Sequence, residues 1–299
     1  MTDDRVDEAT ETFVAYRNLL FTVAYEMLGS AADAEDVLQE TWLRWVGVDL
    51  DQVRDKRAYL VRITTRQALD RLRALSRRKE SYVGPWLPEP LLTSQDVADD
   101  VELAESVSMA LMLVLETLSP TERAVFVLRE VFDVGYDEIA DAVGKSQAAV
   151  RQIAHRAKEH VEARRPRETV TASQTRAVLE SFQRAIATGD IQTLLDVLAP
   201  DVVLLSDGGG FKQAALRPIL GADKVARFMV GALTKANASV TSAPTAVNGS
   251  PALFLRLDGE PDGVLAVTIE GAAVTGVYYV RNPEKLTRME SETPLTLGG

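Results

Sequence analysis

The chain contains no cysteine and only two histidines, so the common thiolate and imidazole metal ligands are nearly absent. Without cysteine there is neither a disulfide framework nor a thiolate metal site. His155 and His160 lie five positions apart, which is not the spacing of a metal-binding pair on one helix face. We therefore expect no metal and no cofactor.

Long apolar segments are lacking too. No uninterrupted apolar run reaches the roughly 18 residues that a membrane-spanning helix needs. The first ten residues, MTDDRVDEAT, are acidic and polar, unlike a signal peptide. These absences favour a cytoplasmic protein with no membrane association, and 299 residues suffice for two or three packed domains.

Positive charge is scarce overall but concentrated in two blocks. The net charge of −11 argues against indiscriminate binding to nucleic acid. Residues 54–79, however, hold ten Lys and Arg against two Asp, and residues 145–167 hold seven against two acids. Residues 80–122 hold nine acids and no base. Two basic blocks separated by an acidic segment predict two separate DNA contacts.

Residues 136–158, YDEIADAVGKSQAAVRQIAHRAK, are the most informative stretch. Ala140 stands where two short helices would cross, Gly144 lies in the turn, and Val150 faces the core, as a helix-turn-helix requires. The cap of the second helix and its polar side would then meet bases and phosphates: Ser146, Gln147, Arg151, His155, Arg156 and Lys158. The alternative is an ordinary helical hairpin in a bundle.

A helix-start signal precedes this motif. In residues 119–122, SPTE, Ser119 is an N-cap, Pro120 occupies the first helical position, and Glu122 completes a capping box. The helix that follows should bury Ala124, Val125, Leu128 and Phe132. Residues 108–167 therefore predict a small all-helical domain that ends in the helix-turn-helix.

Residues 10–79 contain no proline and indicate three helices. Apolar residues recur at helical spacing in FVAYRNLLFTVAYEML, Gly29 and Ser30 interrupt the pattern, and AADAEDVLQETWLRWV resumes it. Trp42 and Trp45 belong to its expected buried face. The third helix, RAYLVRITTRQALDRLRALSRRK, has leucines inside and arginines outside, and a solvated basic face is one interpretation of it.

The segments DAEDVLQETWLRW and RAYLVRITTRQALDRLR resemble domain 2 of the extracytoplasmic-function sigma factors, and residues 115–165 are similar to their domain 4. The resemblance implies a dissociable subunit of bacterial RNA polymerase that binds the beta-prime clamp and the beta flap. Domain 2, residues 10–79, would open the minus-ten element of promoter DNA. Domain 4, residues 108–167, would read the minus-thirty-five element.

The residues of domain 2 divide into two expected surfaces. An exposed acidic ridge would dock on core polymerase: Asp33, Glu35, Asp36, Gln39 and Glu40. Arginines facing the opposite way would hold the phosphates of the melted minus-ten strand: Arg62, Arg66, Arg71, Arg73 and Arg77. One departure is that the common family pattern has Asn at the position of Arg66.

Residues 80–107 are predicted to be a linker. Their beginning, YVGPWLPEPLLT, has three prolines and a glycine, which exclude a helix. Trp86, Leu87 and Pro88 make it too apolar for a free linker, so we expect an extended segment that docks on another part of the protein. The continuation, QDVADDVELAES, is acidic and expected to be solvated.

Residues 170–299 combine helical and strand patterns. Helices are predicted in SQTRAVLESFQRAIATGDIQTLLDVLA, divided at Gly189, and in GADKVARFMVGALTKA, with the strand DVVLLSD between them. Four alternating segments from SVTSAPTAVNG to AAVTGVYYVRN predict an antiparallel meander. This α+β order resembles the SnoaL-like members of the NTF2-like cone fold. The expected fold class is thus multidomain, with two all-α sigma domains followed by an α+β cone.

Three motifs together, YVGPWLPEP, DGGG and NPEKL, resemble the sigma-J-like subgroup of these sigma factors, which carries a fused SnoaL-like domain. The resemblance implies regulation in cis and no separate anti-sigma factor. It marks an interdomain or regulatory set: Trp86, Leu87, Pro88, Asp207, Gly208, Gly209, Gly210, Asn282, Pro283, Lys285 and Leu286. NPEKL could cap the last strand, or lie against domain 2 or the linker.

Relatives of the cone fold include enzymes with an acid–base Asp, and Asp207 is the obvious candidate for such a role. An Asp before three glycines, however, is more simply a turn former. No catalytic constellation is evident, because the other carboxylates fall at predicted turns: Asp201, Asp258, Glu260 and Asp262. We predict no enzyme, and the cone pocket leaves room for an unknown small ligand. The alternatives are a helix-turn-helix regulator without polymerase docking and an enzyme built on the cone.

Overall fold

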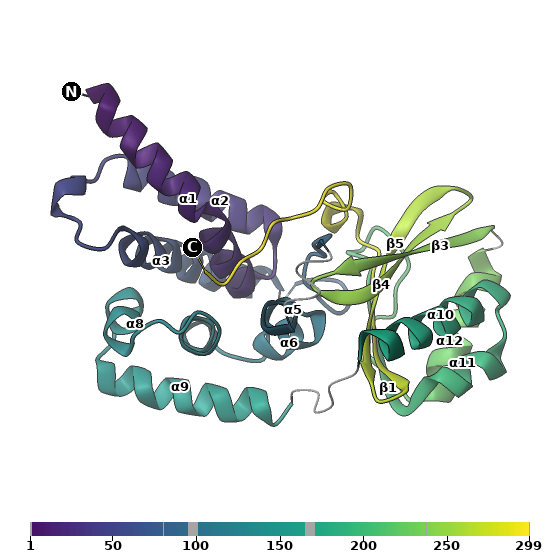
Figure 1. Cartoon of the computed structure of the whole chain (residues 1–299). Coiled ribbons are helices and arrows are strands. Elements are labelled where there is room, and N and C mark those ends of the chain that lie inside the picture. Colours follow the sequence, from purple (N-terminus) through teal and green to yellow (C-terminus); the bar gives the residue numbers. More distant parts are fainter. Residues whose placement is uncertain (1, 80, 95–100, 165–170, 237, 299) are drawn as a thin grey trace. The chain divides into compact units, whose positions relative to one another are not determined.

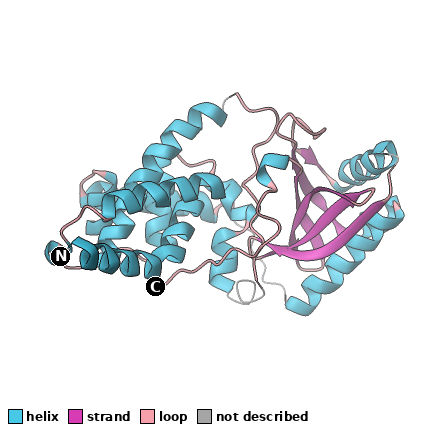
Figure 2. Cartoon of the chain, turned by 90° about the horizontal axis from the view of Figure 1, so that it is seen from above, coloured by secondary structure: helices cyan, strands magenta, loops and turns pink. Residues whose placement is uncertain are grey.

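The computed structural model describes residues 2–79, 81–94, 101–164, 171–236 and 238–298 (Figure 1). The chain forms two compact units. The helical unit comprises Met1–Glu80, Leu111–Arg165 and Pro294–Gly299, and the cone unit comprises Ser81–Ala110 and Pro166–Thr293. Figure 2 shows that the strands of the described residues all lie in the cone unit. Within the described ranges, every helix is too short or too polar to cross a membrane.

The first part of the helical unit consists of the three predicted helices, α1 (Thr2–Leu28), α2 (Ala31–Trp45) and α3 (Lys56–Lys79), with the short η1 (Leu50–Gln52) between the last two. Gly29 ends α1 with a φ of +69°, a conformation that favours glycine. Ser30 caps α2 by accepting a hydrogen bond from the Asp33 amide. The interruption predicted at these two residues is confirmed.

The core of these three helices is formed by α2 and α3 against α1. Trp45 is fully buried, and its indole nitrogen donates to the Ala9 carbonyl at 2.9 Å. Trp42 is half buried and its ring lies 5.4 Å from that of Phe13. The predicted inner face of α3 is confirmed at the buried residues Leu60, Leu69 and Leu72.

The second part of the helical unit contains α6 (Met109–Leu115), α7 (Pro120–Phe126), the π-helical turn η2 (Val127–Val131), α8 (Tyr136–Val143) and α9 (Gln147–Glu162). The capping box is confirmed, because Ser119 and Glu122 each bond the other's backbone amide. The predicted inner face of α7 and η2 is buried: Ala124, Val125, Leu128 and Phe132.

Arg123 of α7 joins the two parts of the helical unit. Its buried guanidinium donates to the Glu26 carbonyl at 2.9 Å, at the end of α1, and to the Glu116 carboxylate at 2.5 Å. Lys79, the last residue of α3, also binds Glu116. Burial disfavours the Glu116 carboxylate, but the two cations outweigh this effect and lower its pKa below the ordinary 4.5.

The cone unit has the predicted α+β order. Its elements are α5 (Val101–Val107), α10 (Ala172–Thr188), α11 (Ile191–Val197), β1 (Leu198–Asp207), β2 (Ile219–Leu220), α12 (Ala222–Ala236), β3 (Val240–Val247), β4 (Ser250–Leu257), β5 (Glu260–Glu270), β6 (Ala273–Val280) and η3 (Pro283–Lys285). The sheet order is β2-β1-β6-β5-β4-β3. The antiparallel meander β3 to β6 is confirmed, and β1 pairs in parallel with β6. The two-residue β2 was not predicted, because so short a segment has no periodicity.

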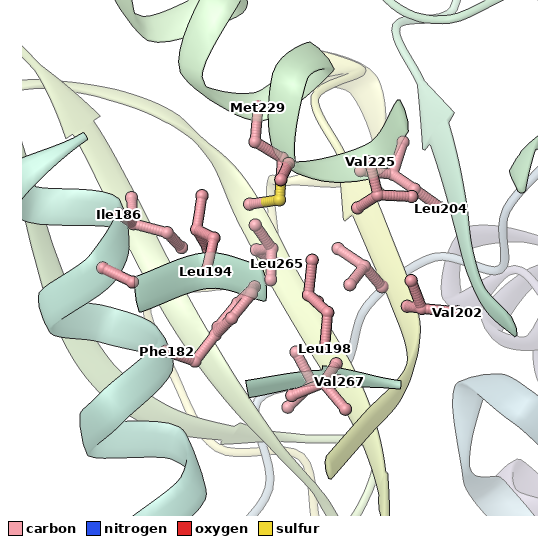
Figure 3. Close-up of a cluster of buried hydrophobic side chains, with 14 of the residues drawn as sticks. Phe182, Ile186, Leu194, Leu198, Val202, Leu204, Val225, Met229, Leu265 and Val267 are labelled. Atoms are coloured by element: carbon pink, nitrogen blue, oxygen red, sulfur yellow. The ribbon is translucent and has the colours of Figure 1, made fainter. Parts of the chain in front are cut away.

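The helices α10, α11 and α12 cover one face of this sheet (Figure 1). Figure 3 shows the core between them, where Phe182, Leu194 and Met229 from the helices meet Leu265 and Val267 from β5. All five side chains are at most 7% exposed, so the packing of these helices fixes the inner surface of the sheet.

The acidic end of the linker differs from the prediction. It was expected to be solvated, yet α5 forms within it and buries Leu103 and Ser106 in the cone unit. Alternating acids concealed a short amphipathic helix of seven residues. The part of this prediction that concerns residues 95–100 lies outside the described residues.

The Glu116 network makes a pH-dependent prediction. Glu116→Gln removes the carboxylate that pairs with both Arg123 and Lys79 and should lower the free energy of unfolding by about 2–4 kcal/mol at pH 7. Because the pKa of Glu116 is lowered by folding, its contribution is complete above about pH 4.5 and is lost as the pH falls through the folded pKa.

Denaturant titrations followed by Trp42 and Trp45 fluorescence should therefore give a constant difference between wild type and variant from pH 7 to about pH 5, and a smaller one below. Glu11→Gln, an exposed site on α1, is the control. Equal stability of wild type and Glu116→Gln at pH 7 contradicts the prediction.

Candidate functional site

The acidic surface of α2 is less uniform than predicted. Asp36, Gln39 and Glu40 are exposed. Asp33 was expected on an exposed ridge but is only 9% exposed, because it lies under the Arg71 guanidinium. Glu35 is half buried and accepts two hydrogen bonds of 2.8 Å from Arg17 of α1. The exposed acidic surface is therefore narrower than predicted and centres on Asp36, Gln39 and Glu40.

Arg71 corrects a second expectation, that the α3 arginines face away from these acids. It donates to Asp33 at 2.7 Å and to Asp36 at 2.9 Å, and the hydrogen bond to Asp33 raises the pKa of Arg71. Arg71 therefore belongs to the acidic surface and not to the opposite face of α3. Its geometry is that of an ion pair between helices.

The other arginines of the predicted minus-ten set differ in their surroundings. Arg62 is half buried over the Tyr59 ring, 4.7 Å from its centroid, and Arg73 pairs with Asp70 at 3.0 Å. Arg66 is exposed and donates to the Asp141 carbonyl at 2.6 Å. The side chain of Arg77 lies outside the described residues.

The bond from Arg66 joins α3 to α8 within the helical unit. Asp141 is in the last turn of α8, where carbonyl groups lack helical partners and carry partial negative charge. An arginine at this place satisfies one such carbonyl and favours contact between the two helices. A side chain predicted to hold DNA is thus occupied by another part of the protein.

The helix-turn-helix of α8 and α9 has the predicted geometry. Gly144 forms the turn with a φ of +68°, and Ala140 and Val150 are buried between the helices. Ser146 caps α9, since its hydroxyl oxygen accepts from the Ala149 amide at 3.3 Å. The Ser146 side chain is therefore engaged with its own helix.

The polar side of α9 contains both free and engaged residues. Gln147, Arg151 and Arg156 are exposed, and neither arginine forms an ion pair within the described part of the chain. Arg151 lies over the Tyr136 ring, 5.4 Å from its centroid. Lys158 pairs with Glu130 at 2.7 Å, and His155 lies 3.6 Å from the Glu159 carboxylate. The free cations lie towards the middle of the helix.

In the cone unit, two groups of the linker bind the Asp207 carboxylate at the end of β1. Asp207 is fully buried and accepts four hydrogen bonds. The Tyr82 hydroxyl donates at 2.6 Å and the Leu87 amide at 3.0 Å, both from the linker. The Gly209 amide donates at 3.0 Å and the Lys285 ammonium at 2.7 Å. Asp207 does form a turn, as predicted, and two of the four hydrogen bonds to its side chain come from the linker.

Lys285 and Asn282 complete the site around Asp207. We call the set of Asp207, Lys285, Asn282, Tyr82 and Leu87 the linker clamp. The buried ammonium of Lys285 also donates to the Leu87 carbonyl at 2.6 Å and lies 3.4 Å from the centroid of the Trp86 ring. Asn282 donates to the Tyr82 hydroxyl at 2.9 Å. The NPEKL segment therefore lies against the linker, which is one of the three positions predicted for it.

The remaining members of the predicted regulatory set surround the linker clamp. Pro88 is buried, Pro283 is exposed at the start of η3, and Leu286 is half buried after it. Glycines are needed because a Cβ on Gly208 would lie 2.0 Å from the Lys212 carbonyl oxygen, and one on Gly209 would lie 2.4 Å from Asn282. Gly210 has a φ of +80°.

A second attachment holds the other end of the linker. Asn248, fully buried in the β3–β4 turn, exchanges two hydrogen bonds of 2.9 Å with the backbone of Leu91, and its side-chain amide donates to the Val107 carbonyl. The Thr93 amide donates to the Ala246 carbonyl of β3 at 3.1 Å. No sequence motif singled out Asn248, although an Asn-Gly pair between strands is a turn signal.

A buried cluster was also missed. Asp262 was assigned to a turn but lies in β5 and is 4% exposed. It accepts from Arg281 at 2.8 and 3.0 Å, from Lys212 at 3.1 Å, and from the Tyr279 hydroxyl. Burial opposes its charge, yet the hydrogen bonds from Arg281 and Tyr279 lower the pKa of Asp262. Such a carboxylate stays ionised and saturated, which does not suit acid–base catalysis.

Comparison with known proteins gives the family. The family model of Sigma-70 region 2 matches residues 12–78, and that of Sigma-70, region 4, matches residues 108–161. The chain is 36% identical over 290 residues to the ECF RNA polymerase sigma factor SigJ of Mycobacterium tuberculosis, which covers 92% of each protein. This chain is an ECF RNA polymerase sigma factor.

Further similarity extends along the whole sigma factor. It is 32% identical over 296 residues to the probable ECF RNA polymerase sigma factor SigI of the same species, covering 98% of each chain. The crystal structure of SigJ superimposes with a TM-score of 0.75 at 34% identity, over 96% of this chain and all of that one. The cone unit is therefore shared with these relatives.

Membership in the ECF sigma factor family decides between the functions that the sequence left open. Sigma factors bind core RNA polymerase and promoter DNA and direct transcription initiation, and they are not enzymes. The enzyme and the polymerase-independent regulator are thereby excluded. Among the described residues, no group of His, Asp and Glu side chains could hold a metal ion.

The linker clamp of this sigma factor can be tested by stability. Asp207→Asn removes the carboxylate that pairs with the buried Lys285 ammonium and should destabilise the cone unit by about 3–5 kcal/mol. Asp201→Asn, an exposed site on the same strand, should change stability by less than about 0.5 kcal/mol. Chemical denaturation followed by the tryptophan fluorescence of variants that retain Trp86 and carry Trp42→Phe and Trp45→Phe measures both, and equal effects would rule out a buried ion pair at Asp207.

Proposed function

We propose that the cone unit restrains this ECF sigma factor in cis by holding both ends of the linker between regions 2 and 4. The observation that carries the proposal is the pair of attachments at Asp207 and Asn248. The first binds the chain directly after α3, and the second binds it up to the residue that ends α5, just before α6. The path of the linker is then set by the cone unit.

Promoter geometry explains how a bound linker would restrain the sigma factor. Elements about 10 and 35 base pairs upstream of the start are roughly 85 Å apart at about 3.4 Å per base pair. In the helical unit, region 2 and region 4 are instead in direct contact through Arg66 and Asp141. A free linker of 28 residues could extend to about 95 Å. Promoter binding therefore requires the two regions to part, which a bound linker opposes.

The C-terminal end of the cone unit supports the same proposal. Beyond η3, the Thr293 amide still bonds the Leu92 carbonyl of the linker at 2.8 Å. The following residues belong to the helical unit, where Leu295 is buried and the Thr296 amide donates to the Thr22 hydroxyl of α1. With restraint built into the chain in this way, no separate anti-sigma factor is required. The protein would act in the cytoplasm, with polymerase and promoter DNA.

Within this function, the exposed acids of α2 would dock on the beta-prime clamp, and region 4 would contact the beta flap. Asp36, Gln39 and Glu40 are the accessible members of the predicted ridge, while Asp33 and Glu35 shape it through their arginine partners. Arg62, Arg66 and Arg73 are the accessible candidates for the minus-ten strand. Arg66 would become available once α8 moves away.

The restraint predicts a gain of activity. Lys285→Met removes the cation that binds both Asp207 and the Leu87 carbonyl, so the linker should detach. Run-off transcription with core polymerase should rise at least about 5-fold, which corresponds to about 1 kcal/mol of coupling. Lys224→Met, an exposed lysine on α12, is the matched control. Equal transcription by both variants and wild type would refute restraint through the linker.

The docking surface predicts a loss of polymerase binding. Reversing the exposed acids with Asp36→Lys and Glu40→Lys should abolish the complex with core polymerase and leave thermal stability within about 1 kcal/mol of wild type. Asp51→Lys, on the exposed η1, should still bind. A double variant that assembles normally in size-exclusion chromatography would reject this surface.

Promoter reading can be tested on α9. Arg151→Ala should cost about 1–3 kcal/mol of binding to the minus-thirty-five element and relax preference at one base position, if its guanidinium contacts a base edge. Gln147 and Arg156 belong to the same exposed side. Lys158→Ala should change only the salt dependence, because this lysine is expected to contact phosphate and not bases. Equal losses on all sequences would make Arg151 a phosphate contact.

A further inference from the structure

The cone unit contains an open cavity of about 470 Å³ between α12 and the ends of β1 and β6, where the lining residues Ser206 and Arg281 directly adjoin Asp207 and Asn282 of the linker clamp. Three cations line it: Arg227, Lys235 and Arg281. A smaller cavity of about 60 Å³ shares Phe228, Ala232, Tyr279 and Arg281 with it. Asp262 also lines this smaller cavity, and its remaining lining residues are aliphatic or Met229. Sites for small molecules usually measure about 300–1,000 Å³ and combine an apolar wall with a few polar groups.

The charge of this cavity is positive, in a protein whose net charge is −11. Asp262 offsets only one of its two close partners, Arg281 and Lys212. Arg227 pairs with Asp223, where both side chains are more than 60% exposed. Lys235 forms no ion pair within the described part of the chain. At least one positive charge therefore faces the cavity without a fixed counter-charge.

Arg281 is held in position for an additional ligand. Its side chain donates to both Asp262 oxygens and to the Gln213 carbonyl at 2.5 Å, which uses three of the five N–H groups of a guanidinium. Two N–H groups remain for a ligand at the cavity wall. The fixed carboxylate orients the guanidinium, so an incoming anion would not need to order it.

We propose that this cavity binds a small organic anion, a carboxylate with an apolar or aromatic body. The carboxylate would meet Arg281 and Lys235, and the body would lie along Phe228 towards the aliphatic side of the smaller cavity. A neutral molecule would not neutralise the cations, and a fully polar anion would leave the apolar wall of the cavity exposed to water. The saturated Asp262 makes the site one of binding rather than of reaction.

The probes are 2-naphthoate, decanoate and the neutral isostere 2-naphthamide, measured by titration calorimetry on the full chain. At least one of the two carboxylates should bind with a Kd in the micromolar to low millimolar range, weaken at high salt, and bind at least 10-fold more tightly than the amide. Binding of the amide equal to that of naphthoate, or no binding of either carboxylate up to about 5 mM, overturns the proposal.

Two variants localise the binding. Gly231 faces the cavity from α12, and a Cβ there would meet no atom within 4 Å. Gly231→Trp should therefore fill the space and reduce carboxylate affinity at least 10-fold, while Gly231→Ala folds with unchanged affinity. Lys235→Ala should weaken the carboxylates several-fold and leave the amide unchanged. Unaltered affinity in both Gly231→Trp and Lys235→Ala places the binding elsewhere and overturns the assignment.

The binding itself is independent of the proposed cis restraint, but its consequence for transcription rests on that function. A ligand bound here contacts Arg281, whose amide donates to the Asp207 carbonyl at 2.7 Å. Run-off transcription with and without the bound carboxylate should differ in wild type and not in Lys285→Met. Binding without any change in transcription retains the site and removes its regulatory role, whereas failure of Lys285→Met to alter transcription counts against the restraint alone.

Discussion

The buried ion pair between Asp207 and Lys285 is the interaction on which the attachment of the linker to the cone unit depends. Neither charge is stable in the interior alone, and each is stabilised by groups from the linker: the Tyr82 hydroxyl, the Leu87 amide and the Leu87 carbonyl. The pair and the linker therefore support each other. Detaching the linker would expose a charge pair that has lost part of its hydrogen bonding, so attachment is expected to be cooperative.

Under the proposed restraint, this arrangement would make the linker a control element. The relative positions of regions 2 and 4 on a promoter depend on a linker that the cone unit can hold at Asp207 and at Asn248. Within the helical unit, the bond between Arg66 and the α8 carbonyl favours the state in which the regions touch. Two weak restraints of this kind suffice, since a coupling of 1–3 kcal/mol changes populations about 5- to 150-fold.

Much of the fold was predictable because local sequence patterns determine it. The capping box at Ser119, the turn at Gly144 and the meander of β3 to β6 all follow from short-range chemistry. The site was predictable only in part. The linker and NPEKL could be predicted to act together, but the Asp207 partners Tyr82, Leu87 and Lys285 lie about 80 to 125 positions away, and no spacing rule connects them. Asp33 and Asp262 were misplaced for the same reason, since their burial depends on arginines from other elements.

Hydrogen exchange of the linker tests the central claim most directly. In the free protein, the amides of Leu87, Leu91 and Thr93 donate to buried groups of the cone unit and should exchange at least about 100-fold more slowly than in an unstructured peptide. In the complex with core polymerase and promoter DNA, the same amides of the intact chain should lose that protection if the linker is released. Fast exchange in the free protein, or equal protection in both states, would contradict the account.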